Sequence, residues 1–250
     1  MKRIVIALAL LLAVSLRAQA QAPQPVPLAQ GGQPGEPHHH LKIENEYVRA
    51  YYVEVPPHES TQLHQHDHDY LFVTLGDSDV INAVRDKPEV HLVLKDGEVH
   101  FMRGGFAHVA RNLADTPFRN VTIELLHSIG QLTNLCAQVA AVASSGGCDK
   151  ALATSSGGHG FTVEGQMETP ETRLDLVRLD PETKGAAAAV PENSLLICLS
   201  DSQVQIDVKG APVRTLHGGE VLWIAKGSRG AASNPSEKPA SYLQLSLTGQ

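Results

Sequence analysis

The fold of this chain is decided by residues 63–76, which read LHQHDHDYLFVTLG. The alternation of this stretch is typical of a β-strand, in which successive side chains point to opposite faces. His64, His66 and His68 are therefore expected to share one face. The pattern predicts three imidazoles that project into one space.

A second stretch, about twenty residues later, carries glycines and polar residues at a demanding spacing. Gly97 is followed after five residues by Arg103, and then by Gly105, His108 and Asn112. We expect the glycines to provide turn geometry and the asparagine to fix a loop. His108 comes from a different segment than the first histidines, so a histidine cluster would form only in the folded chain.

Together the two stretches resemble the paired motifs of the cupin superfamily, small β-barrels that hold one metal ion in the mouth of the barrel. The residues that match are His64, His66 and Gly76 of the first motif and Gly97, Gly105, His108 and Asn112 of the second. Two places differ from the family pattern. Tyr70 or Leu71 occupies the place of a Glu in the first motif, and Arg103 occupies the place of a Pro in the second.

The resemblance implies a metal site made of His64, His66 and His108. Neutral imidazole suits several transition metals, so the expected cofactor is one divalent ion, Zn, Fe, Mn or Ni. Three protein ligands leave coordination positions for water or substrate, as in reactive metal sites. The candidates for a fourth ligand are Tyr70, Asp69, Glu124, His68 or water. Arg103 is expected either on the surface or at the barrel mouth, where it would hold an anion.

The second half of the chain repeats the first. At an offset of 124, Glu44, Arg49, Val53, Pro57 and Leu71 correspond to Glu168, Arg173, Val177, Pro181 and Leu195. At an offset of 122, Gly97, Glu98, Val99, Gly105 and Asn112 correspond to Gly219, Glu220, Val221, Gly227 and Asn234. Repetition over such a length indicates one structural unit present twice.

Short apolar strands separated by turn residues, with almost no helical periodicity, predict an all-β fold. With the repeat, they predict two tandem cupin (jelly-roll) β-barrels, a bicupin. We expect an N-terminal barrel over residues 43–127 with the metal site, a linker over 128–165, and a degenerate C-terminal barrel over 166–250. The second copy has Ala188, Val190 and Gly230 in place of the three histidines, so we expect it to bind no metal.

The N-terminal residues have the pattern of a secretory signal peptide. Lys2 and Arg3 precede a short apolar run, and Ala18-Gln19-Ala20 supplies a cleavage site, so residues 1–20 are expected to be removed on export to the periplasm or outside the cell. Residues 21–42 are rich in Pro, Gly and Gln and are expected to form a disordered leader. Its three adjacent histidines, residues 38–40, are expected either to make a weak adventitious metal contact or to have no role.

Composition limits the partners. Loss of the signal peptide removes three positive charges and takes the formal net charge from −7 to −10, which argues against nucleic acid as a partner. No membrane contact is expected after cleavage, and the chain is expected to be a monomer or a homodimer. In an oxidising compartment Cys136 and Cys148 are expected to pair, whereas Cys198 lies in an apolar run and is expected to be a buried, inert thiol.

Three functions agree with these features. The first is a metal-dependent enzyme that acts on a small organic substrate, and the resemblance to the cupins implies a dioxygenase- or isomerase-like reaction. The second is a protein that binds a carboxylate or sugar through the metal without turnover, and the third is a storage or structural role. The sequence does not decide between them, because one fold supports many reactions.

Overall fold

The computed structural model describes residues 33–135, 154–156 and 160–248. These residues form β-strands and connecting turns, with one short 3₁₀ helix, η1 (Gln33–Gly35). No helix among them has the length and apolar character needed to cross a membrane. The expected signal peptide, residues 21–32 of the expected leader, and both Cys136 and Cys148 lie outside the described residues.

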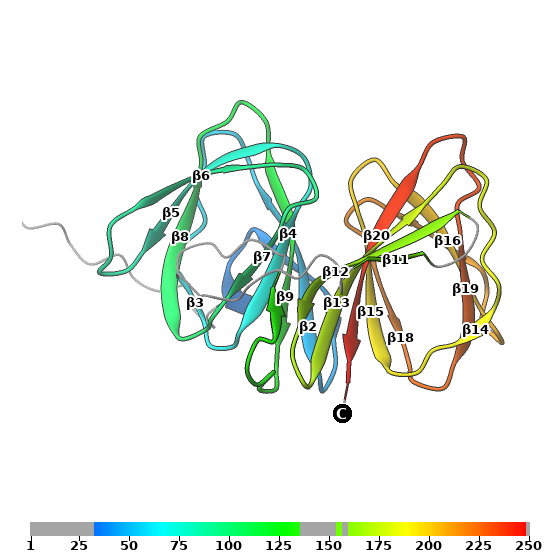
Figure 1. The fold of residues 1–250 in the computed structure, drawn as a ribbon. Coiled ribbons are helices and arrows are strands. Elements are labelled where there is room, and N and C mark those ends of the chain that lie inside the picture. Colours follow the sequence, from blue (N-terminus) through cyan, green and yellow to red (C-terminus); the bar gives the residue numbers. More distant parts are fainter. Residues whose placement is uncertain (1–32, 136–153, 157–159, 249–250) are drawn as a thin grey trace, which may run out of the picture.

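The N-terminal barrel consists of two antiparallel sheets and spans residues 39–125 (Figure 1). In order across the first sheet, its strands are β1 (His39–Glu44), β2 (Val48–Val55), β9 (Phe118–Leu125), β4 (Tyr70–Thr74) and β7 (Val99–Met102). The second sheet contains β3 (His64–His66), β8 (Phe106–Asn112), β5 (Ser78–Val84) and β6 (Val90–Leu94).

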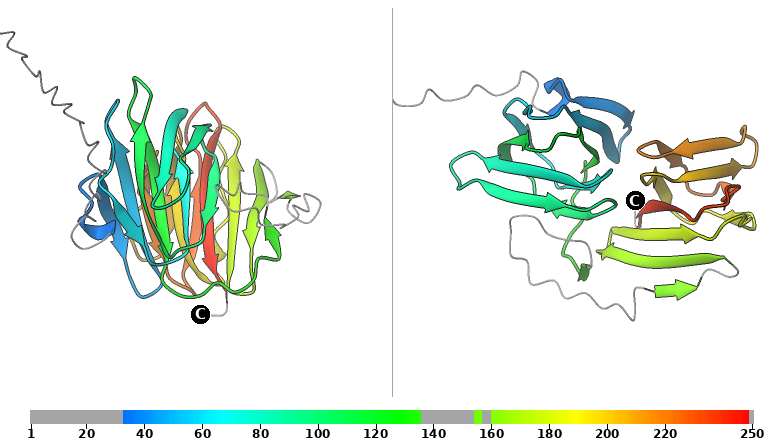
Figure 2. Two further views of the ribbon diagram at one scale, coloured as in Figure 1. Left: turned by 90° about the vertical axis from the view of Figure 1, so that its left-hand side faces the viewer. Right: turned by 90° about the horizontal axis from the view of Figure 1, so that it is seen from above.

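The C-terminal barrel spans residues 161–247 and lies beside the first, as Figure 2 shows from above. Its larger sheet contains, in order, β10 (Asn134–Leu135), β12 (Phe161–Glu168), β13 (Thr172–Leu179), β20 (Ala240–Leu247), β15 (Asn193–Cys198) and β18 (Val221–Ile224), with β11 (Thr154–Ser156) paired to β12. Its smaller sheet contains β14 (Ala188–Ala189), β19 (Arg229–Ser233), β16 (Gln203–Val208) and β17 (Arg214–His217).

The two barrels repeat each other strand by strand. The pairs β3–β8, β4–β9 and β2–β9 of the first barrel recur as β14–β19, β15–β20 and β13–β20 in the second. The register agrees as well, because His64 faces His108 and Ala188 faces Gly230. The prediction of an all-β fold with two tandem cupin barrels is confirmed.

Two asparagines make the same hydrogen bonds in both copies. Asn112 Nδ2 donates to the carbonyl oxygens of Val55, Pro56 and Thr116. Asn234 Nδ2 donates to those of Leu179, Asp180 and Lys238, which are the residues expected from the two offsets. Each asparagine thus joins the last strand of the smaller sheet to two loops. The expected structural role of this residue is therefore observed in both barrels.

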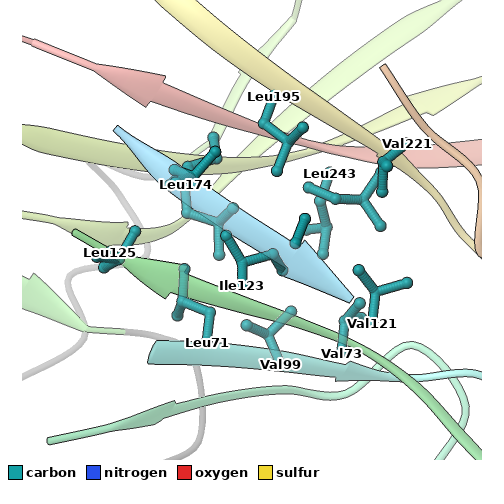
Figure 3. Close-up of a cluster of buried hydrophobic side chains, with 14 of the residues drawn as sticks. Leu71, Val73, Val99, Val121, Ile123, Leu125, Leu174, Leu195, Val221 and Leu243 are labelled. Carbon is teal, nitrogen blue, oxygen red and sulfur yellow. The ribbon is translucent and has the colours of Figure 1, made fainter. Parts of the chain in front are cut away.

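The side chains of the larger sheets alternate between a barrel interior and the surface between the barrels. Tyr70 and Phe72 of β4 line the interior of the N-terminal barrel, whereas Leu71 and Val73 point outward. The outward faces of the two larger sheets meet in one buried apolar cluster (Figure 3). The labelled members are Leu71, Val73, Val99, Val121, Ile123, Leu125, Leu174, Leu195, Val221 and Leu243. The barrels therefore share a core.

The boundaries of the barrels differ from those expected. The first strand begins at His39, so residues 33–42 are ordered structure rather than part of a disordered leader; they are ordered because β1 pairs with β2 along its length. The expected linker contains β10, β11 and the start of β12. Phe161 packs against the core of the C-terminal barrel, which places residues from 161 onward inside that barrel.

Candidate metal centre

His64, His66 and His108 come together in the N-terminal barrel. His64 and His66 lie on the same face of β3, and β8 places His108 directly opposite His64. His108 Nε2 lies 3.1 Å from His64 Nε2 and 3.1 Å from His66 Nε2. One ligand atom from each ring lies within 4.8 Å of the others, so the three can bind one cation.

Hydrogen bonds on the far side of two rings decide where their protons lie. His64 Nδ1 is 2.9 Å from the carbonyl oxygen of Gln62, and His108 Nδ1 is 2.6 Å from Asn82 Oδ1. Both partners accept hydrogen bonds, so each neutral ring carries its proton on Nδ1 and a lone pair on Nε2. Two lone pairs then face each other at 3.1 Å with no hydrogen between them. This donor set fits a metal ion and orients the rings as outer partners of metal-bound histidines do.

His64 and His66 are buried and His108 is partly buried. All three rings are electrically neutral at pH 7. Burial lowers the pKa of His64 to about 4, with a further contribution from the neighbouring His39. Burial and the adjacent imidazoles lower the pKa values of His66 and His108 well below the ordinary value. Because a metal ligand must be unprotonated, the site keeps its ligands ready at neutral pH.

His68 and Asp69 do not belong to the cluster. The strand that was expected to carry His68 on the same face ends at His66, and β4 begins at Tyr70 in the other sheet. Between them Asp69 accepts hydrogen bonds from Arg103 Nη1 at 2.6 Å and from the Gly104 amide at 2.9 Å. Asp69 thus ties the connection between β3 and β4, in which His68 also lies, to the turn after β7. Arg103 is a half-exposed surface residue in an ion pair with Asp69.

Tyr70 and Glu124 both contact His66 from outside the cluster. The ring of Tyr70 stacks on that of His66 with centroids 4.0 Å apart, and burial keeps its phenol protonated by raising its pKa. Glu124 Oε1 is 3.9 Å from His66 Nδ1, on the side away from Nε2, while Oε2 accepts a hydrogen bond from Arg49. Burial raises the pKa of Glu124, and Arg49 opposes that shift. Glu124 lies behind His66, in the place of an outer partner.

The sequence did not indicate Asn82, Glu36 or His39 as residues of the site. Asn82 orients His108, as described above. His39 lines the pocket with its ring 4.7 Å from that of His64, and Glu36 holds it from behind. For Asn82 the repeat contained a usable signal, because the second copy has Ile206 at its place.

The histidines line a small cavity inside the N-terminal barrel. Most of its wall is apolar and includes Val53, Phe72, Val80, Leu92 and Met102. The polar groups other than the cluster are His39, Thr61, Tyr70, Asn82, Asn120 and Thr122. The free volume is about 50 Å³. A water needs roughly 10–15 Å³ of such space, so only a small ligand fits beside the cluster without movement of side chains.

The C-terminal barrel has other residues at all of these places. Strand register puts Ala188, Gly230, Ile206 and Ser246 at the places of His64, His108, Asn82 and Glu124. The residues that hold and orient the cluster have thus changed together, while the asparagine that fixes the loops has been kept. Fold and site together define a bicupin whose N-terminal barrel has a three-histidine centre suited to a divalent metal.

Known structures with the same fold include enzymes. A salicylate 1,2-dioxygenase variant from Pseudoaminobacter salicylatoxidans, in complex with gentisate, aligns with a TM-score of 0.61 over 90% of this chain and 81% of that one, at 13% identity. AerE from Microcystis aeruginosa aligns with 0.59 over 85% and 98%, at 10% identity. An oxalate decarboxylase variant from Bacillus subtilis aligns with 0.56 over 85% and 76%, at 12% identity.

The likeness to these structures is a likeness of fold, because the identities are far below the level at which function follows. No protein-family model matches the chain. No curated protein matches it by sequence either. The predicted fold of two tandem cupin barrels is confirmed, and the chemistry of the chain has to be argued from its own residues.

Proposed function

We propose that this protein binds one divalent transition metal through His64, His66 and His108 and acts as an enzyme on a small organic substrate. The observation that carries the proposal is the pair of Nε2 lone pairs on His64 and His108, which face each other at 3.1 Å. A bound metal supplies Lewis-acid or O₂ chemistry at positions that the protein leaves open. The reaction we propose is dioxygenase- or isomerase-like.

The pocket supports this proposal by its size and lining. It offers about 50 Å³ of free space, an apolar wall and a few polar side chains, which suits one small substrate held in a fixed orientation. Solved structures of the same fold include a dioxygenase and a decarboxylase that act on small aromatic or carboxylic compounds, as their names state. His64 and His66 are buried, which limits the access of bulk water to the site.

Elemental analysis of the purified protein tests the metal site. We expect about one metal ion per chain in the wild type and its loss in each of the variants His64→Ala, His66→Ala and His108→Ala. The matched control is His91→Ala, which removes an exposed histidine of the same sheet that pairs with Asp79. Full metal content in the three cluster variants would refute the site.

The metal-loaded protein then decides between catalysis and binding. A screen of small carboxylic acids and phenols, with O₂ consumption and substrate loss as readouts, should show turnover that His64→Ala abolishes. Spectral evidence of ligand binding without any substrate loss would instead identify a non-enzymatic binding protein.

We also propose that the protein is exported to the periplasm or outside the cell. The support is the sequence of residues 1–20, with two basic residues, a short apolar run and an Ala-Gln-Ala site. Cell fractionation and N-terminal sequencing of the mature chain test it. A start at Gln21 in the extracytoplasmic fraction is expected, and a full-length chain in the cytoplasm would contradict the proposal.

A further inference from the structure

The segment before β2 places a fourth imidazole in the pocket. His39 is the first residue of β1, and its side chain is only 5% exposed. Its ring lies 4.7 Å from that of His64 and 5.9 Å from that of Tyr51, and it lines the same cavity as the cluster. A histidine at the end of the expected leader therefore belongs to the wall of the site.

Glu36 fixes the orientation of His39. Its carboxylate is fully buried, and Oε2 lies 2.6 Å from His39 Nδ1. The same carboxylate accepts hydrogen bonds from the backbone amides of His38 at 2.8 Å and Gln62 at 3.0 Å. Burial alone would raise the pKa of Glu36, but these hydrogen bonds outweigh it and the pKa lies below its ordinary value. The carboxylate is therefore ionised and accepts a hydrogen bond from the Nδ1–H group of His39.

This carboxylate–imidazole pair occurs only in the barrel that has the three-histidine cluster. Val163 occupies the place of His39 in the C-terminal barrel, because His39 pairs with Val53 and Val163 pairs with the equivalent residue, Val177. Glu36 corresponds to Gly160 at the same offset. A pair needed only to pack β1 against β2 has no reason to change with the metal ligands. Its loss together with them links it to the chemistry of the pocket.

His39 does not belong to the set of ligands. Among the described residues, the ligand atoms that gather within 4.8 Å are those of the three cluster histidines. His39 therefore borders the space beside the cation. With its proton on Nδ1 toward Glu36, its Nε2 has a lone pair and can only accept a hydrogen bond.

We propose that His39 accepts a hydrogen bond from the ligand on the metal, so the site prefers small ligands that carry a hydroxyl group beside their metal-binding oxygen. This inference rests on the proposed function, because it needs a metal at the three-histidine cluster. Glu36 is a positioning residue that keeps the acceptor nitrogen turned toward the ligand. The rest of the cavity wall is mostly apolar. The side-chain oxygens of Thr61, Asn82 and Asn120 already accept hydrogen bonds within the protein.

Cobalt-loaded protein provides a test that needs no knowledge of the natural substrate. The probes are glycolate, which has a hydroxyl group next to its carboxylate, and acetate, which lacks it. Their affinities are read from the visible absorption of the bound Co²⁺. In the variant His39→Phe, glycolate should bind about 3- to 10-fold more weakly, the loss of one hydrogen bond, while acetate binding stays within about twofold. His39→Gln, which keeps an acceptor oxygen, should recover part of the glycolate affinity.

The matched control is His40→Phe, the same substitution on the next residue of β1, where the side chain is exposed. It should change neither affinity. Equal glycolate affinity in wild type and His39→Phe, or no response of the wild-type spectrum to either probe, would overturn the inference and leave the metal site standing. Loss of cobalt from His39→Phe would also overturn it, by making His39 a ligand. Failure of the wild type to bind cobalt would instead overturn the proposed function.

Discussion

His64 and His108 each carry the ring proton on Nδ1, because a backbone carbonyl and an asparagine oxygen accept it there. The consequence is a pair of acceptor nitrogens held 3.1 Å apart by partners that do not touch the cation. Ligands held in this way lose little freedom when the metal binds, which favours tight binding. The residues behind the ligands should therefore matter almost as much as the ligands.

Replacement of Asn82 by Ala tests this argument. The variant leaves His108 Nδ1 without its acceptor, so the ring can turn and its proton can move to Nε2. We expect metal affinity to fall about 10- to 100-fold, the usual cost of losing an outer partner, with the fold retained. Competition with a chromophoric chelator measures it. Asn120→Ala is the control, since Asn120 lines the same pocket but bonds to Thr122, and equal effects of both variants would contradict the argument.

The metal-free protein should lose stability in acid over a defined pH range. The pKa of His64 is about 4 in the folded chain and 6.5 when unfolded, so the unfolded state binds more protons between these values. The contribution of neutral His64 to the free energy of unfolding is complete above about pH 6.5 and decreases as the pH falls toward 4. At 1.36 kcal/mol per unit, His64 alone accounts for up to about 3 kcal/mol. Chemical denaturation at several pH values measures this, and His64→Gln should flatten the profile.

The lowered pKa values of the cluster histidines also lower the pH at which we expect the metal to be released. Sequence reasoning alone would place release near the ordinary imidazole pKa, about 6.5. Burial of the three rings lowers their affinity for protons, so we now expect the metal to be retained well below that pH. Dialysis against buffers of decreasing pH, followed by elemental analysis, shows the release point. Release already at pH 6.5 would mean that water reaches the rings more freely than their burial indicates.

The residues that could be predicted are those with a local or repeated signal. His64, His66 and His108 stand at spacings that strand alternation and the second motif interpret directly. Asn82 was overlooked, although its replacement by Ile206 in the second copy marks it. Glu36 and His39 have no such signal, because their roles depend on β1 pairing with β2 and on a hydrogen bond to Gln62, 26 residues away.

At the level of elements, sequence patterns predicted the strands better than their ends. The histidine strand was expected to carry His68 on the face of His64 and His66, but it ends at His66. The next strand, β4, lies in the other sheet, because Asp69 binds the turn after β7. Gly104 makes this possible, since a Cβ there would lie 2.5 Å from the backbone of His68. This contact joins segments 36 residues apart in the sequence. The alternation of polar and apolar residues within either segment does not reveal it. The site is thus shaped by a turn that local patterns do not define.

Variants of the two loop-fixing asparagines, Asn112 and Asn234, should distinguish effects on stability from effects on metal binding. Asn234→Ala removes three buried or partly buried hydrogen bonds from the C-terminal barrel. The carbonyl groups left without a donor should lower the free energy of unfolding by about 1–3 kcal/mol. Asn112→Ala should cost a similar amount. Only Asn112→Ala should also weaken metal binding, because β8 carries His108. Thermal unfolding and metal titration of both variants check this, and a metal defect in Asn234→Ala would contradict the division of roles.

At the level of the whole molecule, the two barrels depend on each other for burial. Apolar residues from the outward faces of both larger sheets are buried against each other in one cluster (Figure 3). An interface of this composition resembles the core of one domain more than the contact between two. The C-terminal barrel therefore completes the shared core although it lacks the histidines of the N-terminal barrel.

A shared core predicts that the barrels unfold together. Trp223, the only tryptophan, belongs to the C-terminal barrel and stacks on Tyr47 of the N-terminal segment, so its fluorescence reports the second barrel and the contact. The absorption of bound Co²⁺ reports the first. Both signals should change at one denaturant concentration. Ile123→Ala, at the shared core, should lower both midpoints by the equivalent of about 2–5 kcal/mol, whereas Val93→Ala, at an exposed site, should leave them in place. Two separate transitions would show that each barrel is stable alone.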